Sequence, residues 1–233
     1  MPKNKLILIP GLLNDERLWA HQVSALGDVA DVEVADITRE DNIPDLARAV
    51  LRRAPEKFSL AGLSMGGYVA QEIMRQEPNR IERLALVDTS ARADTPEQTK
   101  RRKSMMELAT HGKFRGVTPM LLPNLVHPDH VNKPGIGDVV LQMAENIGKD
   151  AFLRQQTALM HRVDSRPDLK NINCPTLILC GREDMLTPPE IHQEMADGIG
   201  DSATLVVVEH SGHLAPLEQP EAVNNAFRKW MQR

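Results

Sequence analysis

The chain has 233 residues, of which 41% are hydrophobic and 26% are charged. This length suits one domain with a large hydrophobic core and disfavours a repeat array or two independent enzymatic domains. The 28 Lys and Arg residues are outnumbered by 32 Asp and Glu residues, which gives a net charge of -4. Since nucleic-acid-binding proteins usually carry a clustered basic face, this balance argues against a nucleic-acid partner.

The N-terminal segment and the two cysteines indicate the compartment. The apolar run 6–9 is too short for the core of a signal peptide, and no stretch approaches the roughly 20 apolar residues of a membrane helix. Cys174 and Cys180 flank the run PTLIL, so within one strand they lie about 20 Å apart, at roughly 3.3 Å per residue. A disulfide requires Cα atoms within about 7 Å. We therefore expect a cytoplasmic protein with unpaired cysteines and no membrane partner.

Six short apolar runs alternate with helical patterns along the chain. The predicted strands are 6–10, 32–36, 58–62, 84–88, 176–180 and 204–208, and the predicted helices are 16–26, 43–54, 65–77, 188–197 and 220–232. Most of these strands are almost continuously apolar, which is typical of a sheet that helices cover on both faces. The alternation predicts an α/β fold with a doubly wound, mostly parallel sheet.

The stretch between Ser90 and Pro175 interrupts this alternation. It shows only helical patterns separated by turns rich in Pro and Gly, and it is far longer than an ordinary connection between a strand and a helix. We interpret residues 91–170 as a helical lid inserted into a core made of residues 1–90 and 171–233.

The strongest chemical signal is the segment Gly62-Leu63-Ser64-Met65-Gly66-Gly67, which lies between a predicted strand and a predicted helix. This is the G-x-S-x-G pattern of a nucleophile elbow, whose tight turn requires small residues two positions before and after the serine. Ser64 is thereby exposed at the edge of the sheet, and the amide of Met65 can face developing negative charge. The alternative is a glycine-rich turn that only packs the helix against the strand.

A serine becomes a strong nucleophile when a base accepts its proton and an acid orients that base. His213 follows the last predicted strand and Asp184 follows the strand before it, so both lie at the same sheet edge as Ser64. Asp88 also follows a strand and is the competing acid. His210 lacks the preceding glycine, so we expect it to be structural or to support the catalytic residues without touching the substrate.

The segments PGLLND, GLSMGG, LVDTS, CGREDMLTPP and HSGHLAPLEQPEAVNNAF together resemble the α/β-hydrolase family. The resemblance implies Ser64 as the nucleophile, His213 as the general base and acid, and Asp184 as the orienting acid. It also implies that the amide of Leu12 is the second oxyanion donor. Pro10 stands where the family usually has His, so we expect a different support for this loop. The resemblance further implies about six strands, without the family's N-terminal antiparallel hairpin.

Several polar residues admit two interpretations. His111, His127, His130 and His161 lie in the predicted lid, where we expect solvated loop histidines and no metal site. The run Lys100 to Lys103 is expected to be a solvated helix face balanced by Glu97 and Glu107, the alternative being contact with an acidic carrier or a phosphate. Asn14 and Asp15 are expected to belong to a turn, the alternative being contact with substrate. The predicted lid also contains apolar side chains that we expect to be divided between the core where the lid docks and an aliphatic acyl pocket. They are Met105, Met106, Met120, Met143 and Met160, together with Phe114 and Phe152.

The predicted function is hydrolysis of a small carboxylic ester through an acyl-enzyme, without a metal or organic cofactor. A serine at the elbow argues against dehalogenase and epoxide-hydrolase chemistry, where similar enzymes use Asp. The alternatives are a C–C bond hydrolase of a ring-cleavage product, a thioesterase or lactonase, and a non-catalytic sensor of a small ligand. The sequence makes no prediction of the oligomeric state.

Overall fold

The computed structural model describes residues 3–112, 114 and 116–233; residues 1, 2, 113 and 115 of the predicted core and lid lie outside this description. Its sheet has six strands in the order β2-β1-β3-β4-β5-β6, and every neighbouring pair is parallel. The strands are β1 (Asn4–Ile9), β2 (Ala30–Val34), β3 (Phe58–Leu63), β4 (Ile81–Val87), β5 (Thr176–Gly181) and β6 (Ala203–Val208). Each overlaps a predicted strand, so the predicted α/β fold is confirmed.

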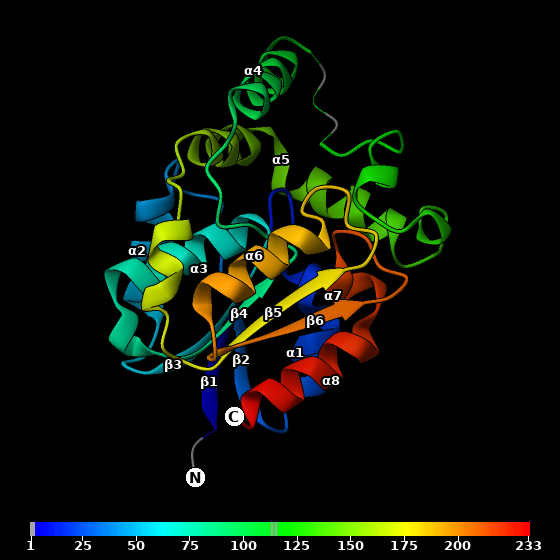
Figure 1. Ribbon diagram of the computed structural model, residues 1–233. Helices are drawn as coiled ribbons and strands as arrows, with labels where there is room; N and C mark the ends of the chain where they lie inside the picture. Colours follow the sequence, from blue (N-terminus) through cyan, green and yellow to red (C-terminus); the bar gives the residue numbers. More distant parts are fainter. Residues whose placement is uncertain (1–2, 113, 115) are drawn as a thin grey trace.

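Helices cover both faces of this sheet (Figure 1). Residues of α2, α3 and α6 belong to the core on one face, and residues of α1 and α8 belong to the core on the other. The helices of these two layers, with the short α7, are α1 (Ala20–Leu26), α2 (Ile43–Arg53), α3 (Met65–Gln76), α6 (Pro189–Ile199), α7 (Ala215–Glu218) and α8 (Pro220–Met231). A 3-10 turn, η1 (Glu16–Trp19), leads into α1.

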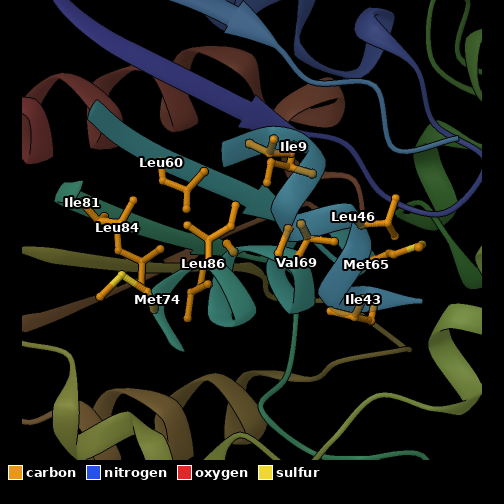
Figure 2. Close-up of a cluster of buried hydrophobic side chains, with 14 of the residues drawn as sticks. Ile9, Ile43, Leu46, Leu60, Met65, Val69, Met74, Ile81, Leu84 and Leu86 are labelled. Atoms are coloured by element: carbon orange, nitrogen blue, oxygen red, sulfur yellow. The ribbon is translucent and has the colours of Figure 1, made fainter. Parts of the chain in front are cut away.

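The alternation of side chains along β1 divides the two cores. Ile7 and Ile9 belong to the cluster under α2 and α3, whereas Leu6 and Leu8 belong to the cluster under α1 and α8. Figure 2 shows the first cluster, in which side chains of the strands meet those of α2 and α3. Since successive residues of a strand point to opposite faces, a continuously apolar strand buries side chains on both. This is the physical basis of the doubly wound sheet.

Helix starts follow the local chemistry of the chain. The side chain of Asn42 caps α2 by accepting a hydrogen bond from the amide of Asp45 at 2.8 Å. The predicted helix 188–197 corresponds to α6, which begins one residue later, at Pro189. Thr187 turns its hydroxyl toward a buried carboxylate, because that bond satisfies both groups inside the protein.

The segment between β4 and β5 contains helices and turns, and its described residues form no strand. It comprises α4 (Pro96–His111), η3 (Leu122–Asn124), η4 (Pro128–His130), α5 (Gly137–Met160) and η5 (Arg166–Asn171). Helix α5 is interrupted at Gly148, whose φ of 76° departs from helical geometry. In Figure 1, α4 and α5 lie above the sheet and its covering helices. The assignment of residues 91–170 as a lid stays a prediction.

No helix in the described part of the chain combines the length and the apolar character needed to cross a membrane. Cys174 and Cys180 are both free thiols, and Cys180 is buried at the end of β5.

Candidate active site

Ser64 occupies the turn between β3 and α3, and its backbone adopts an unusual conformation. Its φ of 52° and ψ of -114° lie in a region that residues with a side chain rarely enter. A Cβ at Gly62 would lie 2.2 Å from the carbonyl oxygen of Gly66, and a Cβ at Gly66 would lie 2.3 Å from that of Ile9. Both glycines are therefore required by close backbone contacts, as the G-x-S-x-G pattern predicts.

Two hydrogen bonds connect Ser64, His213 and Asp184. The Nε2 atom of His213 lies 2.9 Å from the Oγ atom of Ser64, and its Nδ1 atom lies 2.8 Å from the Oδ2 atom of Asp184. The imidazole and the carboxylate are buried, whereas Ser64 is half-buried. Such a chain of hydrogen bonds allows the imidazole to accept the hydroxyl proton while the carboxylate stabilises the resulting charge.

The carboxylate of Asp184 is anchored by donors from its own loop. Its Oδ1 atom accepts hydrogen bonds from the amides of Leu186 and Thr187 at 2.8 and 3.0 Å, and the Thr187 hydroxyl donates to Oδ2 at 2.7 Å. Burial opposes the charged form of Asp184, but His213 and these donors outweigh it, so the pKa of Asp184 is lowered. Burial likewise opposes charge on His213, and the Asp184 carboxylate outweighs it, so the pKa of His213 is raised.

Asp88, the competing acid, is buried beneath this constellation and does not contact the imidazole within hydrogen-bonding distance. Its two carboxylate oxygens accept hydrogen bonds from the amides of Gly181 and Ala215 at 2.9 and 3.0 Å. Burial first, and then the negative charge of Asp184, raise the pKa of Asp88 well above its ordinary value. Asp88 thus joins the end of β5 to the start of α7. His210 is exposed and does not belong to this group.

The amides of Leu12 and Met65 are the predicted oxyanion donors. Neither amide donates a hydrogen bond to another group in the part of the chain that the structure describes. The adjacent residue, Leu13, has a φ of 59°, and its amide donates to the Oε1 atom of Gln155 at 3.1 Å. Gln155 comes from α5 and is fully buried. It therefore supplies support to the loop that begins with Pro10, and nothing in the sequence marked it.

A second buried residue that the sequence analysis did not single out supports the elbow from α6. The Nε2 atom of His192 accepts a hydrogen bond from the amide of Thr89 at 2.9 Å, and the Thr89 hydroxyl donates to the carbonyl of Ser64 at 2.8 Å. The Nδ1 atom of His192 lies 3.3 Å from the carbonyl of Pro188. Burial lowers the pKa of His192 to about 4, so this ring is neutral at pH 7.

Two of the four histidines between β4 and β5 depart from the expectation of solvated rings, and the side chain of the first, His127, is only 12% exposed. His130 is buried, and its Nδ1 atom lies 2.9 Å from the carboxylate of Glu218. Glu218 is also buried and accepts hydrogen bonds from the amides of His127 and Gly212 at 2.7 and 2.9 Å. The carboxylate of Glu218 thus joins the segment around η4 to the loop that carries His213. A hydrogen-bond partner distant in sequence is not visible in the local pattern HPDH, so the prediction for His130 was wrong.

Ser64 and His213 open into a cavity of about 450 Å³. Its walls come mainly from the turn after β1 and from the segment between β4 and β5, and most of them are apolar. The side chains that line it include Leu12, Asn14, Met105, Phe114 and Phe152. Of the methionines assigned to the segment, Met143 is buried in the protein core and Met120 is exposed, so only part of this set faces the cavity. Asp15 instead caps η1.

The basic run on α4 differs from the expected solvated face. Arg101 and Arg102 line the cavity, and the guanidinium of Arg102 bonds Asp94 instead of Glu97 or Glu107. The prediction of a solvated side chain was therefore wrong for Arg102, which is half-buried because the helix turns it toward the cavity and Asp94. Arg101 borders the cavity but is exposed to solvent, as expected. Lys100 and Lys103 are exposed as expected. Among the described residues, no group of three or more His, Cys, Asp or Glu side chains is arranged to hold a metal ion.

Comparison with known proteins identifies the family to which the chain belongs. A model of the Alpha/beta hydrolase family matches residues 6–226. The chain is 30% identical to a thermophilic esterase from Thermogutta terrifontis, solved with malate bound, with a TM-score of 0.89 over 99% of this chain and 90% of that one. It is 27% identical to the pimeloyl-[acyl-carrier protein] methyl ester esterase of Nitrosomonas europaea, over 91% of this chain and 84% of that protein. It is also 30% identical to BpoC of Mycobacterium tuberculosis, named as a candidate non-heme bromoperoxidase, over 97% of this chain and 92% of BpoC.

The chain therefore belongs to the alpha/beta hydrolase family. Esterases occur among its relatives in both sequence and structure, and the class of protein that the fold and the relatives define is a hydrolase.

Proposed function

We propose that this hydrolase cleaves a small carboxylic ester through a covalent acyl-enzyme, with Ser64 as the nucleophile. The observation that carries the proposal is the pair of hydrogen bonds, 2.9 and 2.8 Å long, from Ser64 to His213 and from His213 to Asp184. The apolar cavity above Ser64 supports a small uncharged reacting group, and the esterases among the relatives support the ester bond.

The reaction begins when the Oγ atom of Ser64 attacks the ester carbonyl and His213 accepts the serine proton at Nε2. The carbonyl oxygen becomes an oxyanion, to which the amides of Leu12 and Met65 donate hydrogen bonds. His213 then gives the proton to the leaving alcohol as the C–O bond breaks, which leaves Ser64 acylated. Loss of one oxyanion donor typically costs about 2.7–4 kcal/mol of transition-state stabilisation.

Deacylation repeats the same proton transfers with water. His213 accepts a proton from the attacking water, and the tetrahedral intermediate expels the Oγ atom of Ser64, which receives that proton back. Asp184 accepts the Nδ1 hydrogen bond throughout and stabilises the imidazolium form, in accord with the raised pKa of His213. No metal or organic cofactor takes part in this scheme.

Replacement of the nucleophile tests the proposal. Ser64→Ala should fold and lose nearly all turnover of a short-chain aryl ester, since the residual activity then comes only from binding and the oxyanion donors. Ser24→Ala is the matched control, because Ser24 is exposed on α1, remote from the cavity. Turnover by Ser64→Ala equal to that of the control would refute the proposal.

The same protein preparations distinguish the other reaction types. Aryl esters, thioesters, lactones and a coloured dienoate of the ring-cleavage type are offered in parallel at equal concentration. The proposal predicts the highest kcat/KM for an ester. Consumption of the dienoate alone would establish C–C bond hydrolysis instead, and an absence of turnover on every substrate would favour a ligand sensor.

A further inference from the structure

One end of the cavity wall is basic, and the proposed ester hydrolysis does not use it. Arg101 and Arg102 of α4 and Gln156 of α5 line the cavity together with Ser64 and His213. We refer to Arg101, Arg102 and Gln156 as the basic corner. No acidic side chain occurs among the described residues that line this cavity.

The ion pairs around the basic corner leave it with an excess of positive charge. The Nε atom of Arg102 lies 2.7 Å from the carboxylate of Asp94, which is almost completely buried. Arg162 also pairs with Asp94, so two guanidinium groups share one carboxylate. Arg101 contributes a further positive charge and makes no ion pair within the described part of the chain. Arg101 is exposed, so solvent screens its charge. Arg102 and Arg162 together still carry one positive charge more than Asp94 balances, so this part of the wall is cationic.

The hydrogen-bonding groups of the basic corner are donors. Arg102 uses three of its five N–H groups, two toward Asp94 and one toward the Oε1 atom of Gln156 at 2.8 Å. Because Arg102 occupies the amide oxygen of Gln156, the orientation of that amide is set, and its NH₂ group is the end left to donate. A planar set of donors with positive charge matches a carboxylate, which accepts hydrogen bonds only.

The basic corner and the nucleophile are connected through neighbouring structure. Tyr68 lies one helical turn after Ser64 on α3 and also lines the cavity. The guanidinium of Arg162 stacks 4.4 Å from the centre of the Tyr68 ring, and Arg162 shares Asp94 with Arg102. Since Ser64, Tyr68 and Arg102 all border one cavity of about 450 Å³, one small molecule can reach both Ser64 and the basic corner.

We propose that the natural substrate is an anionic ester, in which a carboxylate distant from the scissile bond binds to the basic corner. This inference rests on the proposed ester hydrolysis and adds the class of substrate. The apolar residues that make up most of the cavity wall then contact the hydrocarbon part of the molecule.

The test compares monomethyl and dimethyl esters of the same dicarboxylic acids, across a series of chain lengths. A second pair, an O-acetyl hydroxy acid and its carboxamide, moves the carboxylate to the alcohol portion. In at least one pair the anionic ester should have a kcat/KM about 10- to 100-fold higher, the factor expected of one or two hydrogen bonds to a charged group. Added salt should reduce this preference through screening.

Two variants and a control assign the preference to residues. Arg102→Gln and Arg101→Gln should each reduce the ratio of the two kcat/KM values, and Arg102→Gln should reduce it more. Lys103→Gln removes the same charge from the same helix outside the cavity, and it should keep the wild-type ratio. Because the ratio is measured within one preparation, partial misfolding of a variant does not change it.

Equal kcat/KM values for the anionic and neutral members of both pairs would overturn the inference while the proposed ester hydrolysis stands. A preference that survives in both arginine variants would also overturn it. If the wild-type protein hydrolysed none of these esters but did hydrolyse the aryl ester, only the inference would be overturned. Hydrolysis of neither would overturn the proposed function and the inference together.

Discussion

Replacing each of the two buried carboxylates, Asp184 and Asp88, by asparagine tests which of them orients His213. In Asp184→Asn, the amides of Leu186 and Thr187 still need an acceptor at the position of Oδ1, so the new amide oxygen is held there. Its NH₂ group then occupies the position of Oδ2, 2.8 Å from the Nδ1 atom of His213. The imidazole must accept at Nδ1 and carry its proton on Nε2, where it can no longer accept the proton of Ser64.

The wrong imidazole tautomer lowers the rate far more than the loss of one ordinary hydrogen bond. We expect kcat/KM for an aryl ester to fall about 10³- to 10⁴-fold, equivalent to about 4–5.5 kcal/mol of transition-state stabilisation. The fold should persist, because the two loop amides keep their acceptor. Initial rates and the midpoint of urea unfolding, measured on the same preparation, report these two quantities separately.

Asp88→Asn is the matched variant. Two amides, of Gly181 and Ala215, donate to separate oxygens of Asp88, and an amide side chain offers only one oxygen. One buried N–H therefore loses its acceptor, which should cost about 1–3 kcal/mol of stability and change kcat/KM less than about tenfold. A rate loss in Asp88→Asn as large as that in Asp184→Asn would refute the assignment of Asp184 as the orienting acid.

Three further outcomes follow from the buried groups. The raised pKa of His213 predicts that kcat/KM falls as the pH falls, with a midpoint above the ordinary value of 6.5, and a midpoint below 6.5 would contradict it. Gln155→Leu removes the acceptor of the Leu13 amide, so kcat/KM should fall at least about tenfold and the free energy of unfolding by about 1–3 kcal/mol. A kcat/KM within twofold of the wild type would contradict the role of Gln155. The lowered pKa of His192, about 4, means that the unfolded chain binds a proton below pH 6.5 that the folded chain does not. Stability is therefore complete above pH 6.5 and falls by about 3 kcal/mol as the pH approaches 4. His192→Gln should remove this part of the fall in urea titrations at pH 7 and 4.5, and an unchanged fall would contradict it.

The sequence predicts well those features that a short segment determines by itself. The six predicted runs correspond to the six strands, because the side chains of most of them are apolar on both faces. The elbow at Ser64 was recognisable since the requirement for Gly62 and Gly66 is local to one turn. Asp184 and His213 could be placed near Ser64 because parallel strands end at the same edge of the sheet.

The features that the sequence did not indicate depend on partners distant along the chain. Gln155 contacts Leu13 across 142 positions, and an isolated glutamine in a helix carries no signal of such a bond. His130 had been assigned to solvent because its partner, Glu218, lies 88 positions away. Arg102 had been assigned to a solvated face because the sequence of α4 alone does not reveal which side of the helix faces α5. That rotation is set by packing, which brings Arg102 to Gln156.

The most direct test of the central proposal is covalent labelling of the intact protein with an organophosphonate, followed by mass spectrometry of its peptides. A serine activated by the Ser64–His213–Asp184 hydrogen bonds should take up one phosphonyl group per chain, on Ser64, with simultaneous loss of ester turnover. His213→Ala should label far more slowly. Absence of an adduct on Ser64 while ester turnover proceeds would contradict the proposal.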